Sequence, residues 1–291
     1  MNSRIKLKKI NKILIFYNNF RGLNLSKYLS GKGFDIFNII TTKFLNKKIL
    51  NKINSKNLKI IQNLKSKGLI DFIKKNKFDL IISAGFPHIF KKKFFGLTKF
   101  GIINLHAGKL PKYKGGSPLV WQIINNEKKI GLSVIKINEQ IDGGKVICKI
   151  NFKNKITDDI MKVHRKANKL FLKLTFQSIN KLNLQKKLFS QPKSSSYFKQ
   201  RKDSDAFINF DKTNLSVYNL IRAQSNPYKG AFFFNNRRKF RLLKCKMSSL
   251  SPNISNGVIF KLKNKKSLFI KCRINSIKIL KIKPSINLIK I

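Results

Sequence analysis

Long apolar runs and acidic side chains are both scarce in this chain of 291 residues. No stretch approaches the roughly 20 apolar residues that a membrane-spanning helix needs. The first residues, MNSRIKLKKINKILIFYNNF, place a basic lead before a short apolar stretch that no small-residue cleavage site follows. They therefore predict a first core strand rather than a signal peptide, and we expect a cytoplasmic protein without membrane insertion.

Cysteine is also rare, with three residues, Cys148, Cys245 and Cys272, spaced far apart. Their odd number and the absence of a C-x-x-C pair argue against structural disulfides and against a zinc site. A reducing compartment fits this usage. We expect no metal in this protein.

The shortage of acidic residues produces an unusual charge, because 64 lysines and arginines face 11 aspartates and glutamates, for a formal net charge of +53. One interpretation is a polyanionic partner such as RNA. The other is mutational bias, since lysine far outnumbers arginine and the chain is also rich in Asn, Ile and Phe, which all have A/T-rich codons. Lysines are scattered through every segment, whereas a phosphate-binding surface is expected to use more arginine. We favour bias, although the charge would still attract anionic substrates.

The first two thirds of the chain alternate apolar strand-like runs with amphipathic segments. This order predicts an α/β fold with a mostly parallel sheet. In such a sheet the reactive groups lie at the carboxyl ends of the strands. The ranges expected as strands are 12–17, 34–40, 58–61, 79–83 and 102–105, and those expected as helices are 23–29, 69–75 and 158–182.

The pattern changes after residue 184. Residues 185–204 are polar, basic and rich in serine, which is typical of a linker. A helix at 215–223 and short alternating segments then predict a small β-rich domain, with strands expected at 231–234, 240–245, 257–262 and 268–274. The expected division is therefore 1–184, 185–204 and 205–291.

The chemically informative residues are Asn104, His106 and Asp142. Asn104 and His106 end a predicted strand at alternate positions, so they point to the same face of the sheet. Asp142 lies in an acidic loop that ends in a glycine turn. Acyl transfer to an amine needs a donor for the developing oxyanion, a proton acceptor and a group that orients it. Asn, His and Asp can supply these functions, but spacing alone fits equally well with a structural strand end and turn.

The surrounding segments resemble the folate-dependent formyltransferases, whose pattern is N-x-H, then L-P-x-x-x-G and x-P, then G-x-[ST] and D-x-G. The chain matches this order in NLHAGKLPKYKGGSP and GLSVIKINEQIDGG. Several linked elements are more specific than a single motif. The resemblance implies a Rossmann-like fold, 10-formyltetrahydrofolate as the formyl donor, and Asn104, His106 and Asp142 as catalytic residues. The middle residue of D-x-G is often threonine and here is Gly143, which we expect to loosen the loop.

The resemblance extends to SAGFPHI at residues 83–89, where the family holds the pterin ring through a loop backbone. It implies two folate-lining segments. They contain Phe86, Pro87, His88 and Ile89 in the first, and Glu139, Gln140 and Ile141 in the second. We expect His88 to be incidental to a loop that binds through its backbone.

The acceptor is less clearly specified. The glycinamide ribonucleotide formyltransferases resemble only the first domain, so the extra hundred residues of this chain argue against that subfamily. Both the methionyl-tRNA formyltransferases and the amino-sugar-nucleotide formyltransferases carry a barrel-like, OB-type second domain. The segment NLIRAQSNPYKGAF at 219–232 resembles the sugar type. Residues 41–57 lack the Gly/Pro-rich insertion that the tRNA enzymes carry, although a biased sequence could lose such a loop and keep its role.

We therefore expect a nucleotide-linked amino sugar, destined for surface polysaccharide, as the amine acceptor, with initiator methionyl-tRNA as the alternative. A hypothesis from a different class of function is a non-catalytic RNA-binding protein built on the same two domains. Lys109, Lys112 and Arg222 are weak candidates for holding substrate phosphates. The sequence is compatible with a homodimer and does not specify the oligomeric state.

Overall fold

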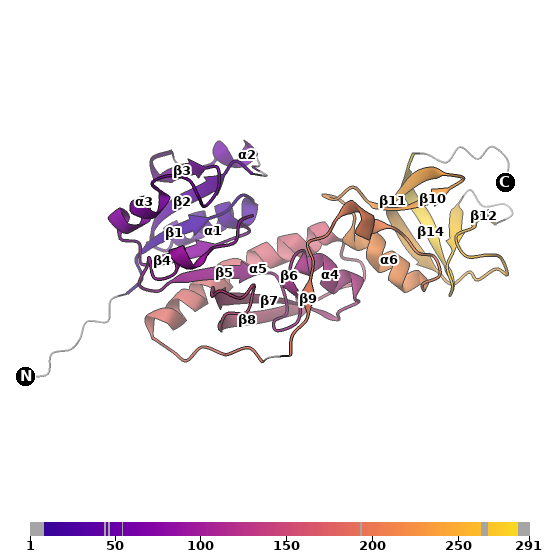
Figure 1. Ribbon diagram of the computed structural model, residues 1–291. Helices are drawn as coiled ribbons and strands as arrows, with labels where there is room; N and C mark the ends of the chain where they lie inside the picture. The colour runs from indigo at the N-terminus through magenta and orange to yellow at the C-terminus, as the bar shows by residue number, and fades with distance from the viewer. Residues whose placement is uncertain are drawn as a thin grey trace, which may run out of the picture. The chain divides into compact units, whose positions relative to one another are not determined.

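The computed structural model describes residues 9–43, 45, 47–53, 55–192, 194–262 and 267–284. The chain forms two compact units, each built from segments that are not contiguous in sequence (Figure 1). The first comprises Met1–Lys114, Gly131–Asn151 and Lys166–Tyr197, and the second comprises Gly115–Ile130, Phe152–Arg165 and Phe198–Ile291. The expected division at residues 184 and 205 was contiguous, whereas the second unit takes two segments from before residue 184.

The larger sheet has seven strands in the order β3-β2-β1-β4-β5-β7-β8. The pairs β1 with β2, β1 with β4, β2 with β3 and β4 with β5 are parallel, and β5 pairs antiparallel with β7. This confirms the expected mostly parallel sheet. Its strands are β1 (Lys12–Phe16), β2 (Asp35–Thr41), β3 (Leu58–Ile61), β4 (Leu80–Ser83), β5 (Ile102–His106), β7 (Lys129–Lys136) and β8 (Val146–Lys153).

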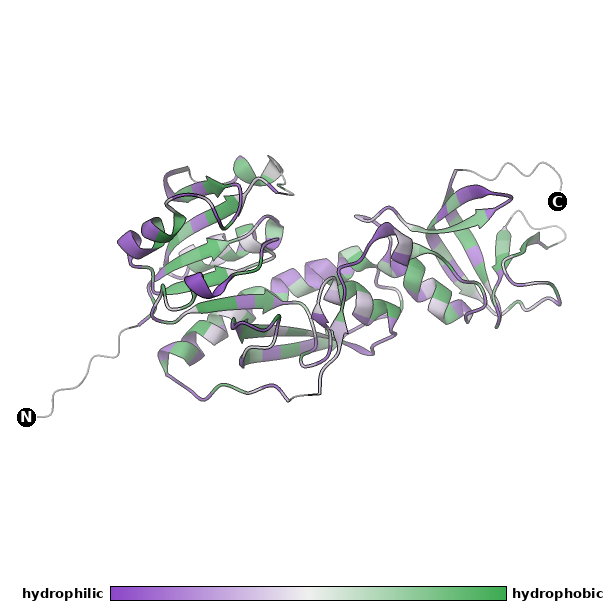
Figure 2. Ribbon diagram, viewed as in Figure 1, coloured by the Kyte–Doolittle hydropathy of each residue, from purple (hydrophilic) through white to green (hydrophobic). Residues whose placement is uncertain are grey.

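The central strands of this sheet are nearly continuous apolar runs because both of their faces are covered. Every residue of β4 is buried, and so are four of the five in β1. Figure 2 shows these strands mostly in green, the colour of hydrophobic residues. A cluster of buried side chains that includes Leu14, Phe16, Ile81 and Phe94 forms part of the core of the first unit.

The helices follow from local sequence signals. The first begins after Asn19, whose side chain accepts a hydrogen bond from the Arg21 backbone N–H, and it is followed by Gly31. Among the described residues, no helix is long and apolar enough to cross a membrane. The helices are α1 (Phe20–Ser30), α2 (Lys47–Leu50), α3 (Leu69–Asn76), α4 (Pro118–Ile124), α5 (Ile160–Asn183) and α6 (Asn214–Ala223), with short 3-10 helices η1 (Ser55–Asn57), η2 (Lys92–Phe94) and η3 (Asp203–Ala206).

The second unit contains a curled, antiparallel five-stranded sheet in the order β10-β11-β14-β13-β12. Helix α6 packs against it, and Val217 and Ile221 of α6 share a core with Phe233, Leu242 and Ile277 of the sheet. The strands are β10 (Ala231–Asn235), β11 (Arg238–Ser248), β12 (Ile259–Lys261), β13 (Leu268–Lys271) and β14 (Ser276–Lys283).

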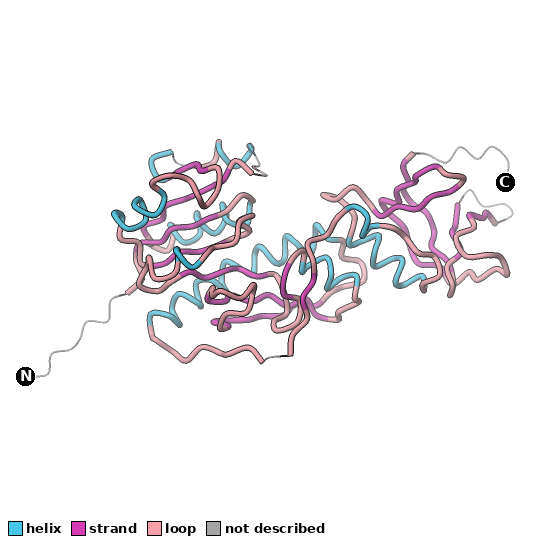
Figure 3. Tube along the Cα trace, in the orientation of Figure 1, coloured by secondary structure: helices cyan, strands magenta, loops and turns pink. Residues whose placement is uncertain are grey.

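Most of the expected elements are confirmed to within a few residues, but three of the longer strands and the helices α2 and α4 were missed. The pair β7 and β8 and the long strand β14 were not predicted. The expected linker is mostly loop between α5 and η3 (Figure 3). It also contains β9 (Tyr197–Phe198), which pairs with β6 (Lys114–Gly115), and a bridge between Phe189 and Val146.

Candidate active site

Asn104 and His106 project from the carboxyl end of β5, between β4 on one side and β7 on the other. His106 is 5% exposed and Asn104 is half-buried. In the strand register Asn104 lies opposite Ile135 and His106 opposite Ser133. A regular strand thus places both polar side chains on one face, as their spacing predicted.

The imidazole of His106 is held from both nitrogens. Nδ1 lies 3.3 Å from Asp142 Oδ2, and Nε2 lies 2.7 Å from the backbone oxygen of Tyr113, to which a protonated Nε2 donates. An imidazolium ring would donate from both nitrogens in this position. Gly108 makes room for the ring, since a Cβ there would lie 2.2 Å from Nε2. Ser133 Oγ donates to the Gly108 oxygen at 2.9 Å, which fixes this loop to β7.

Asp142 reaches both members of the pair on β5. Besides its contact with His106, its Oδ1 lies 3.4 Å from Asn104 Nδ2, so one carboxylate joins the trio. Asp142 has a φ of 49°, in the left-handed region where aspartate costs less than most residues. The glycine after next, Gly144, is required for packing, because a Cβ there would lie 1.6 Å from the backbone oxygen of Lys136. The structure therefore brings together the three residues that the sequence proposed as catalytic.

Gln191 is a positioning residue that sequence reasoning missed. Its Nε2 donates to the backbone oxygens of Asp142 at 2.8 Å and Gly144 at 2.7 Å, so it spans the turn that carries the carboxylate. It lies in the serine-rich stretch that was interpreted as a linker. The sequence around Gln191 shows an amide side chain among small and basic residues. That pattern does not identify a hydrogen-bond partner some fifty residues away in the chain.

The two expected folate-lining segments follow the ends of two strands of the larger sheet, β4 and β7. Residues 86–89 follow β4 and residues 139–141 precede Asp142, and the exposed pair Lys92 Nζ and Glu139 Oε1 at 3.6 Å joins the two regions. Phe86 packs edge-on against Phe16 with ring centroids 5.1 Å apart. Ile89 and Ile141 are 61% and 47% exposed.

His88 has a defined partner within its loop. Its Nε2 lies 3.2 Å from Thr41 Oγ1, and that hydroxyl donates to the Gln62 oxygen at 2.6 Å. Partial burial, together with the positive charge of Lys43, lowers the pKa of His88 below its usual value. His88 therefore links the loop after β4 to the end of β2. It makes no contact with the trio among the described interactions.

The three candidate phosphate-binding residues differ in exposure. Lys109 is half-buried and Lys112 is exposed, both in the loop after β5. Arg222 is 5% exposed in α6, where its guanidinium donates to Asn154 Oδ1 at 3.0 Å and to the Asp158 backbone oxygen at 2.7 Å. An arginine that is buried and bonded in this way holds the second unit together, which argues against the phosphate contact expected from sequence.

No group of three or more His, Cys, Asp or Glu side chains in the described part of the chain could hold a metal ion. The trio offers an amide donor, an imidazole and a carboxylate at the carboxyl end of β5. These are groups for binding a polarised oxygen and for moving a proton at a nearby nitrogen.

Comparison with known proteins supplies the family context. A family model described as formyl transferase matches residues 39–178, and one described as formyl transferase, C-terminal domain, matches residues 201–287. The bifunctional polymyxin resistance protein ArnA of Wigglesworthia glossinidia brevipalpis is 33% identical over 76% of this chain and 33% of its own length. The methionyl-tRNA formyltransferase of Malacoplasma penetrans is 30% identical over 70% of this chain and 64% of its own length. The aligned region thus spans less than two thirds of either relative.

Among solved structures, WlaRD, a sugar 3N-formyl transferase crystallised in the presence of dTDP and 5-N-formyl-THF, superposes with a TM-score of 0.71. The alignment covers 96% of this chain and all of that chain at 23% identity. This likeness supports the fold, including the curled sheet of the second unit.

Proposed function

The chain belongs to the formyl transferase family, and from that membership we propose that it transfers a formyl group from 10-formyltetrahydrofolate to a primary amine. The observation that carries this proposal is the meeting of Asn104, His106 and Asp142 at the carboxyl end of β5, where the Asp142 carboxylate lies 3.4 Å from Asn104 Nδ2 and 3.3 Å from His106 Nδ1. A non-catalytic RNA-binding protein on the same fold has no need of this joint geometry.

Each residue of the trio has a distinct task in the proposed reaction. Asn104 Nδ2 donates a hydrogen bond to the formyl oxygen as negative charge develops there. His106 Nε2, once it releases the Tyr113 oxygen, takes a proton from the attacking amine and returns one to the departing nitrogen, while Nδ1 stays with Asp142. Asp142, 3.3 Å from Nδ1, orients the ring and stabilises its positive form. The amine nitrogen forms a bond to the formyl carbon as the bond from that carbon to the folate nitrogen breaks.

The two lining segments fit a folate in their chemistry. Ile89 and Ile141 offer exposed apolar surface that a flat, largely aromatic ligand would cover. The loop that includes residues 86–89 is polar in its backbone and packed from beneath by Phe16 and Phe90 through contacts with Phe86. Such a loop can present fixed N–H and C=O groups to a pterin ring, as the family resemblance implies.

For the acceptor we propose a nucleotide-linked 3-amino or 4-amino deoxysugar. The segment 219–232 resembles the sugar-type enzymes, and the fold is close to that of a sugar 3N-formyl transferase. Initiator methionyl-tRNA is the second candidate, favoured by relatives that carry that name and by the high positive charge. We propose Lys109 and Lys112, on the loop after β5, as the lysines that would bind a phosphate of the acceptor.

The test is to incubate the full chain with 10-formyltetrahydrofolate and, separately, with a panel of amino-sugar nucleotides and with initiator methionyl-tRNA. Mass spectrometry of the acceptor is expected to show a formylated sugar nucleotide. An Asp142→Asn variant should fold normally and lose at least about a hundredfold in turnover. Product on tRNA alone would replace the acceptor, and near-normal turnover by Asp142→Asn would remove Asp142 from the mechanism.

A further inference from the structure

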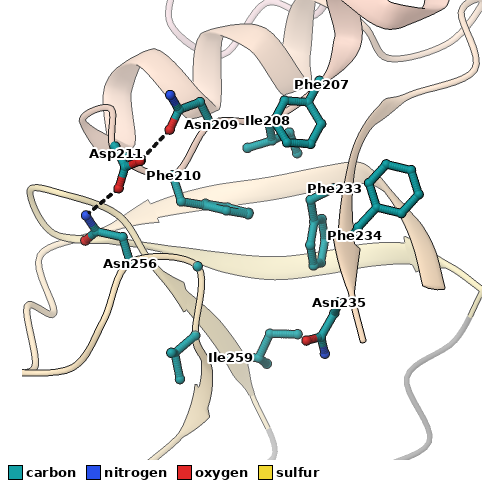
Figure 4. Close-up of a pocket in the computed structure, with 12 residues that line it drawn as sticks. Phe207, Ile208, Asn209, Phe210, Asp211, Phe233, Phe234, Asn235, Asn256 and Ile259 are labelled. Atoms are coloured by element: carbon teal, nitrogen blue, oxygen red, sulfur yellow. Dashed lines mark hydrogen bonds between the residues drawn. The ribbon is translucent and has the colours of Figure 1, made fainter. Parts of the chain in front are cut away.

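Two clusters of polar groups in this protein differ in how their hydrogen bonds are used. A cavity of about 720 Å³ in the second unit is bordered by Asn209, Asp211 and Asn256 (Figure 4). Asn256 Nδ2 donates to Asp211 Oδ1 at 2.9 Å, and the Asp211 N–H donates to Asn209 Oδ1 at 2.7 Å, so these groups bond to one another. Around His106, by contrast, a backbone oxygen holds the nitrogen that the proposed reaction needs.

The two oxygens around the His106 ring are both hydrogen-bond acceptors. Asp142 Oδ2 lies 3.3 Å from Nδ1, and the Tyr113 backbone oxygen lies 2.7 Å from Nε2. A neutral imidazole has one N–H and one lone pair, so one of its nitrogens would face an oxygen with lone pair against lone pair. With Asp142 ionised, only the imidazolium form donates to both oxygens, and a ring that is 5% exposed has little access to water. The observed arrangement therefore fits the protonated ring.

One serine holds the peptide group that carries the Tyr113 oxygen. The Tyr113 N–H donates to Ser196 Oγ at 3.1 Å, and the Lys114 N–H donates to the Ser196 backbone oxygen at 3.0 Å. Tyr113 has a φ of 63°, in the left-handed region that is unfavourable for a bulky side chain. Its backbone therefore needs support to keep the oxygen at Nε2, and the two bonds to Ser196 give that support.

The same contact blocks the general-base function of His106. To accept a proton from the attacking amine, Nε2 must present its lone pair where the Tyr113 oxygen now lies. When the ring is neutral, with its remaining proton on Nδ1 toward Asp142, the hydrogen bond to Tyr113 is replaced by repulsion between two lone pairs. Loss of the Nε2 proton and departure of the Tyr113 oxygen are therefore coupled. Any group that supports the Tyr113 backbone in this position favours the protonated ring.

We infer that Ser196 is a positioning residue that sets how readily His106 becomes a base. By bonding to the Tyr113 N–H it stabilises the covered, protonated state of the ring, and it touches no reacting atom. As this state opens, Nε2 gives its proton to water, and the amine can then transfer a proton to the same lone pair. The catalytic consequence rests on the proposed function, whereas the effect of Ser196 on the protonation of His106 does not.

The charged groups near the His106 ring are the same in the variants that test this inference. Asp142 is in contact with Nδ1, and Lys109 and Lys112 lie on the loop after β5. Ser133, opposite the ring on β7, carries no charge. The acceptor amine also titrates in the same way with each variant. A difference between variants therefore reports on the contact between Nε2 and the backbone oxygen.

The test replaces Ser196 with alanine and follows the pH dependence of kcat/KM for formyl transfer from about pH 5 to about pH 9. One neutral hydrogen bond of about 1 kcal/mol corresponds to about a fivefold change in an equilibrium. Ser196→Ala should therefore raise kcat/KM about fivefold on the acid limb, move that limb about 0.7 pH units lower and leave the plateau unchanged. Ser196→Thr keeps the hydroxyl and should match the wild type. Ser195→Ala is the matched control, because Ser195 is the exposed neighbouring serine.

A second measurement does not depend on activity. The chain has three histidines, so ¹⁵N NMR of the imidazole nitrogens can follow the His106 ring in a pH titration, with its signals assigned by their absence from His106→Gln. The midpoint should be about 0.7 pH units lower in Ser196→Ala than in the wild type and in Ser195→Ala. A lower midpoint without formyl transfer by the wild type would keep the positioning role and reject the proposed function. Equal midpoints, or a loss of kcat/KM at every pH with an unchanged midpoint, would overturn the inference.

Discussion

Gln191→Leu should reduce turnover while leaving the fold and the three catalytic side chains in place. Gln191 Nε2 makes two hydrogen bonds, to the backbone oxygens of Asp142 and Gly144, and leucine has a similar size without a donor. Both of these bonds go to backbone oxygens of the turn, so Gln191 acts on the reaction through the conformation of the turn that carries Asp142. The change therefore tests whether the conformation of that turn limits catalysis.

The magnitude follows from the bonds. Each neutral hydrogen bond contributes about 1 kcal/mol net, so the pair contributes about 2 kcal/mol to the observed turn. The left-handed backbone of Asp142, with φ of 49°, costs about 1 kcal/mol or more on its own. Without Gln191 this cost is no longer offset, and the turn spends less time in the conformation that meets His106. A loss of about 2 kcal/mol corresponds to about a 30-fold fall in kcat.

The assay is steady-state formyl transfer to the acceptor identified by the panel described above, with urea unfolding of the same preparations. Gln177→Leu is the matched control, because Gln177 is an exposed glutamine on α5. A fall in kcat with a similar KM for the amine, and a stability change of at most about 2 kcal/mol, is expected for Gln191→Leu. Unchanged kcat in a folded Gln191→Leu protein would refute the positioning argument. Recovery of part of the activity in Gln191→Asn, which retains a donor, would support it.

Three further predictions concern the same framework. Gly108→Ala should lower kcat at least about tenfold with near-normal binding of folate, measured by calorimetry, because the new methyl would displace the ring of His106; an unchanged kcat would show that the ring can move freely. Arg222→Met should lower the free energy of unfolding in urea by about 1.5–3 kcal/mol, since it leaves the backbone oxygen of Asp158 without its charged donor. A change in KM without loss of stability would instead indicate a substrate contact. The lowered pKa of His88 means that the folded state binds its proton less readily than the unfolded state, so stability should fall as pH drops below about 6.5; His88→Gln should flatten this part of the pH dependence of urea unfolding, and an identical slope in the variant would contradict it.

Local sequence was sufficient for most of the central elements and for the common face of Asn104 and His106. Strands β1 and β4 are short apolar runs, and their burial in a parallel sheet leaves few other interpretations. Asn104 and His106 are two positions apart on a strand, so their common face follows from the period of a strand. Strand β8 was missed because it mixes apolar and charged residues, as edge strands do. Strand β7 is its neighbour in the sheet and was missed with it.

The turn at Asp142 illustrates a different limit. From the sequence we expect a loose turn, because Gly143 stands where related enzymes often have threonine. In the structure a Cβ at Gly143 would lie 2.7 Å from Gln140 Cβ, and Gln191 bonds to the backbone on either side of the glycine. Crowding and these two bonds hold the turn, and neither can be inferred from residues 138–144 alone.

Residue type and spacing along the chain were therefore enough to predict an α/β protein with a small β-rich second domain and to place Asn104 and His106 on one face at a strand end, since strand period and strand ends are local properties, whereas a role in formyl transfer was implied by the family resemblance. Tertiary structure alone decided which distant groups meet. It placed Gln191 on the Asp142 turn, and it buried Arg222 against Asp158 instead of leaving it for a phosphate. Contacts of this kind depend on how chain segments far apart in sequence pack together, and no local pattern of residues encodes that packing.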